Sequence, residues 1–182
     1  MATNNDSRLY VFESELEGFI SFIQEGGKYS TCTFCFVMPD DVMEKALLDR
    51  AELLQEVAEK LPPGTDREVN SPRWNEEGFV KYSWGGTTSR QAPVVIDEYG
   101  DPVATHIQDA IRSGTIAKLI VEQKAYWKPC LGTSLTVHGV QIKKLVTSNE
   151  VSNPGLEIDE VRELCGVNQN TFRSKVSKAL AL

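Results

Sequence analysis

The sequence predicts a mainly β fold, a small Greek-key barrel covered by one α-helix, with a short helical segment near its C-terminal end. Three observations support this prediction. Several short β-rich runs are separated by turn residues, one long amphipathic helix stands early in the chain, and two runs within residues 118–146 are spaced as a strand pair. The pattern fits a barrel of the oligonucleotide-binding kind, but a generic α+β sandwich would give much the same periodicity, so both folds stay open on the pattern alone.

The bulk properties favour one ordinary core with a small appendage, because the chain has 182 residues. It contains no apolar run long enough to cross a membrane, and its polar start lacks the features of a signal peptide. We therefore expect no membrane contact and a cytoplasmic location, in the host cell if the protein is viral. The cysteines, at positions 32, 35, 130 and 165, lack the spacing of a zinc site, so we expect plain thiols, no metal and no cofactor.

Two strands are expected before the helix. Residues 1–8 are polar and are expected to be frayed, and residues 18–24 form a plausible first strand. Residues 29–38 alternate and predict a second strand. Its better core face is the one shared by Cys32, Phe34, Phe36 and Met38.

The clearest helix begins at Asp40-Asp41, where acidic side chains suit a helix N-terminus, and is stopped by Pro62. Its apolar stripe at helical spacing predicts that it covers a sheet. Residues 62–77 then read as a loop. Further strands are expected over residues 79–84 and 92–96, followed by a connection over residues 102–116 with a helical turn near residues 107–111.

The last strand pair spans residues 118–128 and 135–146. Leu135 and Val137 set one phase of alternation, while Val140 and Ile142 set the opposite one. One extra residue near Gly139 would produce this change, so the sequence predicts a β-bulge there.

Charge is distributed unevenly, although the whole chain has a net charge of −7. Residues 1–78 hold 16 acidic and 7 basic residues, whereas residues 79–148 hold 5 acidic and 8 basic residues. The basic excess coincides with the aromatic strands, and the local field decides where a polyanion binds. The sequence contains no nucleophile, zincin or P-loop motif around its two histidines, so we expect a binding protein and not an enzyme.

Adjacent aromatic and basic residues are typical of a surface that stacks bases and neutralises phosphates. The candidate stacking residues are Trp74, Tyr82, Trp84, Tyr126 and Trp127, and the candidate phosphate contacts are Arg73, Lys81, Arg90, Lys118, Lys124, Lys128, Lys143 and Lys144. By alternation, Tyr126 faces outward with the lysines while Trp127 leans toward the core. Tyr82 and Trp84 share one face, and Lys81 takes the opposite one.

The order of motifs resembles the phage single-stranded DNA-binding protein family. The resemblance lies in Thr33-Phe34-Cys35-Phe36-Val37-Met38-Pro39-Asp40-Asp41 leading into a long helix, Phe79-Val80-Lys81-Tyr82, Val94-Val95-Ile96-Asp97, Tyr126-Trp127 before Gly132, and Lys143-Lys144-Leu145-Val146. It covers roughly residues 9–148. It implies an oligonucleotide-binding barrel with a capping helix that coats single-stranded DNA in replication and recombination, acts as a homodimer or cooperative homo-oligomer, and contacts polymerase and primase-helicase. The family usually ends in a strongly acidic tail, whereas this chain ends in Lys178-Ala179-Leu180-Ala181-Leu182, so recruitment of partners by such a tail is not expected.

A C-terminal segment over residues 156–182, after a linker at residues 149–155, resembles the helix-turn-helix of lac-repressor-type regulators. The barrel domain would then span residues 1–148. The candidate duplex-binding residues are Gln169, Asn170, Thr171, Arg173 and Lys175. Three functions stay open: a single-stranded DNA-binding protein, a duplex-DNA-binding architectural or regulatory protein that uses this segment, and a protein-interaction domain. The alternative for the segment itself is a helical hairpin that packs on the barrel or on a second subunit and has no role in DNA binding.

Overall fold

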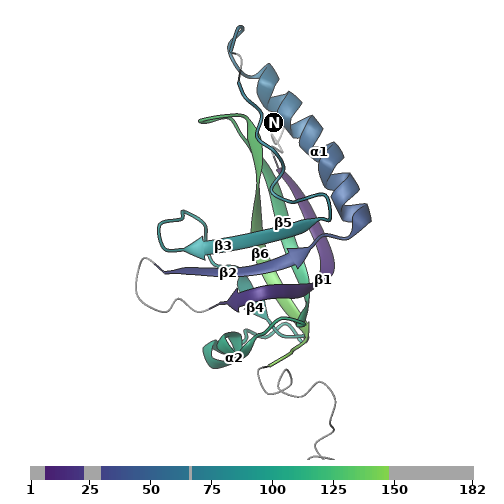
Figure 1. The fold of residues 1–182 in the computed structure, drawn as a ribbon, viewed down its shortest axis with the longest axis vertical. Coiled ribbons are helices and arrows are strands. Elements are labelled where there is room, and N and C mark those ends of the chain that lie inside the picture. The colour runs from purple at the N-terminus through teal and green to yellow at the C-terminus, as the bar shows by residue number, and fades with distance from the viewer. Residues whose placement is uncertain (1–6, 23–29, 66, 148–182) are drawn as a thin grey trace, which may run out of the picture. The chain divides into compact units, whose positions relative to one another are not determined.

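The computed structural model describes residues 7–22, 30–65 and 67–147, and this part of the chain is mainly β (Figure 1). In chain order its elements are β1 (Ser7–Ser21), β2 (Thr31–Val37), α1 (Asp40–Glu59), β3 (Phe79–Gly85), β4 (Val94–Ile96), α2 (Thr105–Ala110), β5 (Ile116–Tyr126) and β6 (Gly132–Lys144). The described strands form one six-stranded mixed sheet in the order β3-β2-β1-β5-β6-β4. The predicted linker and helix-turn-helix fall on residues 149–182, which lie outside the described residues.

β1 joins the two halves of the sheet. Its first half pairs with β5, from Ser7 opposite Lys124 to Glu15 opposite Ile116, and its second half pairs with β2, beginning with Leu16 opposite Phe36. As a result β2 and β3 cross the long strands β5 and β6 at a steep angle (Figure 1). This strand order and the single covering helix are consistent with an oligonucleotide-binding-like fold.

The first strand was predicted in the wrong place. β1 begins at Ser7 instead of residue 18, so Ser7 and Arg8 are not frayed. The alternation was hidden because apolar residues occupy both faces: Tyr10 and Phe12 are buried, while Leu9 and Val11 are exposed. The long ladder with β5 fixes this segment, and such a distant partner cannot be read from local sequence.

The other predicted strands are confirmed with small shifts in their ends. The predicted core face of Cys32, Phe34 and Phe36 in β2 is buried, and so is Met38 directly after the strand. The predicted bulge is also confirmed: Ile120 lies opposite Gly139 while Val121 lies opposite Val137, which leaves His138 as the extra residue of β6. The bulge lets side chains on both sides of it reach the same core.

The helix α1 begins at Asp40 as predicted and buries Ala46, Leu53 and Val57. The buried stripe is narrower than predicted, because Leu47 is exposed.

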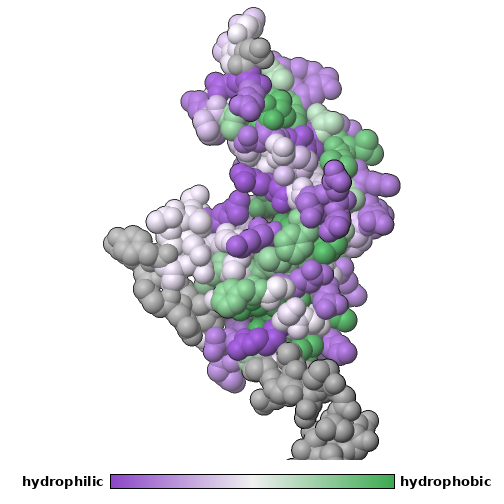
Figure 2. Space-filling view, viewed as in Figure 1, coloured by the Kyte–Doolittle hydropathy of each residue, from purple (hydrophilic) through white to green (hydrophobic). Residues whose placement is uncertain are grey.

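Hydrophilic side chains border each hydrophobic patch on the face seen in Figure 2. No helix within the described ranges is both long and apolar enough to span a membrane.

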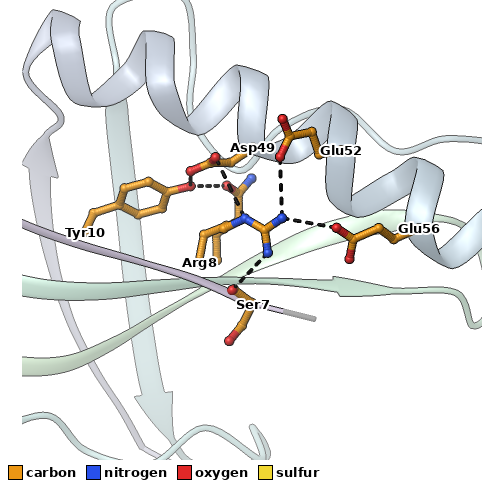
Figure 3. A network of polar contacts seen from close by, with 7 residues as sticks. Ser7, Arg8, Tyr10, Asp49, Glu52 and Glu56 are labelled. Atoms are coloured by element: carbon orange, nitrogen blue, oxygen red, sulfur yellow. Dashed lines mark hydrogen bonds and ion pairs between the residues drawn. The ribbon is translucent and has the colours of Figure 1, made fainter. Parts of the chain in front are cut away.

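Polar contacts between β1 and α1 complement this apolar packing (Figure 3). Arg8 Nη2 lies 3.1 Å from Glu56 Oε1 and 3.5 Å from Glu52 Oε2. Tyr10 Oη lies 2.8 Å from Asp49 Oδ2 and 2.8 Å from the side-chain amide of Gln123. Both partners are acceptor oxygens, Asp49 Oδ2 and Gln123 Oε1, so the single phenol proton is donated to one of them at a time. Burial, together with Asp49, raises the pKa of Tyr10, which therefore stays neutral.

Candidate nucleic-acid interface

Three of the predicted phosphate contacts meet beside β3, which is an edge strand of the sheet. Arg73, Lys81 and Arg90 line a depression of about 180 Å³ together with Val80, Tyr82 and Leu135. The guanidinium carbon of Arg90 lies 5.6 Å from the centre of the Tyr82 ring. The lining of this depression includes no acidic side chain, so its local potential is positive although the chain as a whole is acidic.

Trp127 is the exposed aromatic ring of the β5–β6 hairpin. Its exposed fraction is 43%, so the prediction that it leans toward the core was wrong. The alternation used for that prediction holds only inside a strand, and β5 ends at Tyr126. Two cations flank the indole, with Lys128 Nζ 4.5 Å and the guanidinium carbon of Arg67 5.8 Å from the ring centre.

Tyr126 is half-buried. Its hydroxyl accepts a hydrogen bond from Asn70 Nδ2 at 2.8 Å. Its ring lies against Gly132, where an added Cβ would come within 2.5 Å of Tyr126 Oη. Tyr126 therefore braces the base of the hairpin, and Trp127 offers the more accessible face for a base.

The remaining three stacking candidates are buried in the core. Tyr82 and Trp84 do share a face, as predicted, but that face is the inner one, where their ring centres lie 5.8 Å apart. Trp74 belongs to the same buried cluster. Of these three rings only Tyr82 lines the basic depression, and none of them presents an open face to solvent.

Two residues of the surface were missed by the sequence reasoning. Phe19 has an exposed fraction of 77% and follows Gly18, whose φ is +67°, within an irregularity where β1 shifts register against β2. Alternation from Leu16 and Ile20, which are both buried, would have indicated that Phe19 points outward. No sequence pattern indicated Arg67, because it lies in a loop without periodicity.

An extended connection joins the hairpin to the β3 edge. Arg67 Nη1 donates to the carbonyl oxygens of Trp127 (2.8 Å) and Pro129 (3.2 Å), and Val69 forms a bridge with Leu131. Six residues further along, the same connection reaches Arg73, a span of at most roughly 20 Å. We call this surface the basic track, and it comprises Arg67, Arg73, Lys81, Arg90, Trp127 and Lys128.

The remaining predicted lysines lie apart from one another, with Lys143 and Lys144 exposed at the end of β6. Lys124 lines a groove with Lys60 and Trp127 near the end of α1, so it borders the basic track. Lys118 lies on the outer face of the sheet beside Ile120 and is paired in register with Glu13. The structure therefore does not bring Lys118 together with the other cations.

Comparison with solved structures supports the fold. The structure of gp2.5, a single-stranded DNA-binding protein of bacteriophage T7, is 15% identical, covers 86% of this chain and 99% of its own, and has a TM-score of 0.49. The single-stranded DNA-binding protein of bacteriophage Enc34 is 10% identical, covers 87% of this chain and 90% of its own, and has a TM-score of 0.51. The structure of its C-terminal truncation is 12% identical, covers 78% of this chain and 87% of its own, and has a TM-score of 0.50. Comparisons with protein-family models and with curated sequences give no match. At these identities the two Enc34 structures show that this chain shares their fold.

Proposed function

We propose that this chain is a non-sequence-specific single-stranded DNA-binding protein that holds the strand along the basic track. The observation that carries the proposal is the convergence of Arg73, Lys81 and Arg90 on one depression free of acidic lining residues. The shared fold with the Enc34 protein, which is described as binding single-stranded DNA, supports the same function.

Different chemical groups bind the strand at the two ends of the basic track. Guanidinium and ammonium groups at the β3 edge bind phosphates, and each of these interactions releases a condensed counterion. Trp127 stacks on a base at the hairpin end, where Arg67 and Lys128 add positive charge next to the ring. Stacking and phosphate binding read no base edge, so the binding is independent of sequence.

The wider role follows from the same proposal. A barrel domain over residues 1–148 would coat and protect the strand during phage DNA replication or recombination, as a dimer or cooperative oligomer, with polymerase and primase-helicase as partners. The duplex-binding alternative depends on residues 156–182, and no feature of the part that the structure describes favours it.

Fluorescence anisotropy of labelled oligo-dT over a series of salt concentrations tests the proposal. The double variant Lys81→Ala/Arg90→Ala should weaken binding and reduce the slope of log affinity against log salt by about 0.7 for each phosphate that is no longer neutralised. The matched control is Lys143→Ala/Lys144→Ala, which removes two exposed cations at the far end of β6 and should leave the affinity nearly unchanged. Binding that is insensitive to salt, or an equal reduction of affinity in the two double variants, would overturn the proposal.

Tryptophan fluorescence gives a second reading of the same titration. Trp74 and Trp84 are buried and Trp127 is exposed, so quenching by unlabelled oligo-dT should come mainly from Trp127. Trp127→Phe should remove most of the quenching while the buried emission remains. Full quenching in this variant would place the bound bases elsewhere.

A further inference from the structure

The outer face of strands β1, β5, β6 and β4 carries an exposed apolar row. Val11 lies opposite Ile120, Ile120 lies opposite Gly139, and Gly139 lies opposite Val94, so the row crosses all four strands. The exposed fractions are 52% for Val11, 39% for Ile120 and 64% for Val94. With Leu9, which is also exposed beside Val11, these residues form what we call the apolar row.

A groove follows the row because Gly139 contributes no side chain between Ile120 and Val94. The groove has a volume of about 490 Å³, and Val140 and Ile96 add to its largely apolar lining. Four neighbouring strands make the row roughly 14 Å wide. A contiguous exposed apolar surface of this kind marks an interaction site, whereas apolar side chains exposed singly do not.

We infer that the apolar row is an interface between two copies of this chain. Along β5 the outward residues are Lys118, Ile120 and Glu122, a cation and an anion on either side of an apolar centre. A two-fold axis in the interface plane, perpendicular to β5 and passing at Ile120, sets Lys118 of each copy opposite Glu122 of the other. One patch thus complements itself, as an isologous interface requires, with apolar groups at the centre and charges at the rim.

The charges around the row also argue against DNA as its occupant. Glu13 lies opposite Lys118 in the ladder, and Glu122 lies 3.0 Å from His138 Nε2. Carboxylates beside the only lysine of the groove lining repel a polyanion. The inference rests on the dimeric part of the proposed function and not on its DNA binding, because no residue of the basic track belongs to the row and the interface would leave both tracks open.

Sedimentation of the full chain without nucleic acid, over a wide range of protein concentrations, tests the interface. The wild-type chain should shift from monomer to dimer as the concentration rises. Ile120→Asp and Val94→Asp, the second at a more exposed position and so safer for folding, should stay monomeric while circular dichroism and the melting temperature show a folded protein. Leu48→Asp is the matched control, because Leu48 is exposed on α1 outside the row, and it should dimerise as the wild type does.

Charge reversal distinguishes a specific two-fold interface from non-specific hydrophobic association. Lys118→Glu and Glu122→Lys should each weaken the dimer, by about tenfold for a rim pair that becomes a repulsion. The double variant Lys118→Glu/Glu122→Lys should recover the dimer, because it exchanges the cation and the anion, so that opposite charges again face each other across the interface. The interaction between Glu122 and His138 is absent from the double variant as well, so it cannot explain a recovery. A wild-type chain that stays monomeric, dimers unaffected by both aspartate variants, or a double variant no better than the single ones would each overturn the inference.

Discussion

Asn70 Nδ2 donates a hydrogen bond of 2.8 Å to Tyr126 Oη, and this contact joins the connection before β3 to the β5–β6 hairpin. The same amide nitrogen lies 2.9 Å from Cys130 Sγ. The backbone N–H of Asn70 donates to the carbonyl oxygen of Leu131 at 2.8 Å, and its own carbonyl accepts from Arg50 of α1. One residue therefore positions three elements, and the two ends of the basic track keep a fixed relation because of it.

Replacing Asn70 should loosen this junction. Asn70→Ala leaves the half-buried hydroxyl of Tyr126 without its donor, which we expect to lower the free energy of unfolding by about 1–3 kcal/mol. Urea denaturation measures the change. Gln91→Ala removes an exposed amide of similar size and should change the stability by less than about 0.5 kcal/mol. Equal stabilities for the two variants would show that the Asn70 side chain does not hold the hairpin.

The contact between β1 and α1 leads to a second prediction. Tyr10→Phe keeps the buried ring and removes only the hydroxyl, so Asp49 and Gln123 lose their shared partner. We expect a reduction of about 1.5–3 kcal/mol in the free energy of unfolding, the range for a hydrogen bond to a charged group. Tyr99→Phe, at a residue with an exposed fraction of 83%, is the control and should be neutral. A Tyr10→Phe variant as stable as the wild type would mean that apolar packing alone docks the helix.

Phe19 is predicted to contribute to DNA binding without contributing to stability. Its exposed ring lies on the half of β1 that pairs with β2, and Lys81 of β3 faces outward from the same half of the sheet. Phe19→Ala should reduce the affinity for oligo-dT by about 1–3 kcal/mol, the range for one stacked base, and leave the melting temperature nearly unchanged. Tyr99→Ala removes another exposed ring from the turn after β4 and should not affect binding. If the two variants bind equally well, Phe19 lies off the path of the strand.

The parts of the fold that depend on local alternation were predictable. The core face of β2 and the bulge at Gly139 both follow from which side chains must be buried, because a strand has a period of two residues. The start of α1 followed from the acidic residues after Pro39 in the same way.

The predictions that were wrong concern features that depend on contacts between residues distant in sequence. The end of β5 at Tyr126 reversed the expected orientation of Trp127, and the ladder between β1 and β5 ordered a segment expected to be frayed. The sequence also did not indicate which of the predicted cations lie close together. Lys81 and Lys118 are both exposed strand lysines, yet only Lys81 lies at the β3 edge near Arg73 and Arg90, because the strand order puts β2 and β1 between β3 and the strand β5 that carries Lys118. Strand order is a property of the whole sheet and leaves no trace in the sequence around one lysine.

The pair of Glu122 and His138 should make stability depend on pH in the acidic range. The hydrogen bond from His138 is the largest cause that lowers the pKa of Glu122 below its ordinary value of 4.5, so the folded state favours the ionised carboxylate. Its stabilisation is therefore present above about pH 4.5 and disappears as the pH falls through the lowered folded pKa. The side chains are partly exposed, so we expect His138→Ala to cost less than about 1 kcal/mol near pH 6, and this difference from wild type should vanish near pH 3. Urea denaturation across this range measures it. The control is His106→Ala, at the other histidine of the chain, which is exposed on α2 and should cost less stability than His138→Ala near pH 6. A His138→Ala variant whose difference from wild type is the same at both pH values would show that the ion pair contributes nothing to folding.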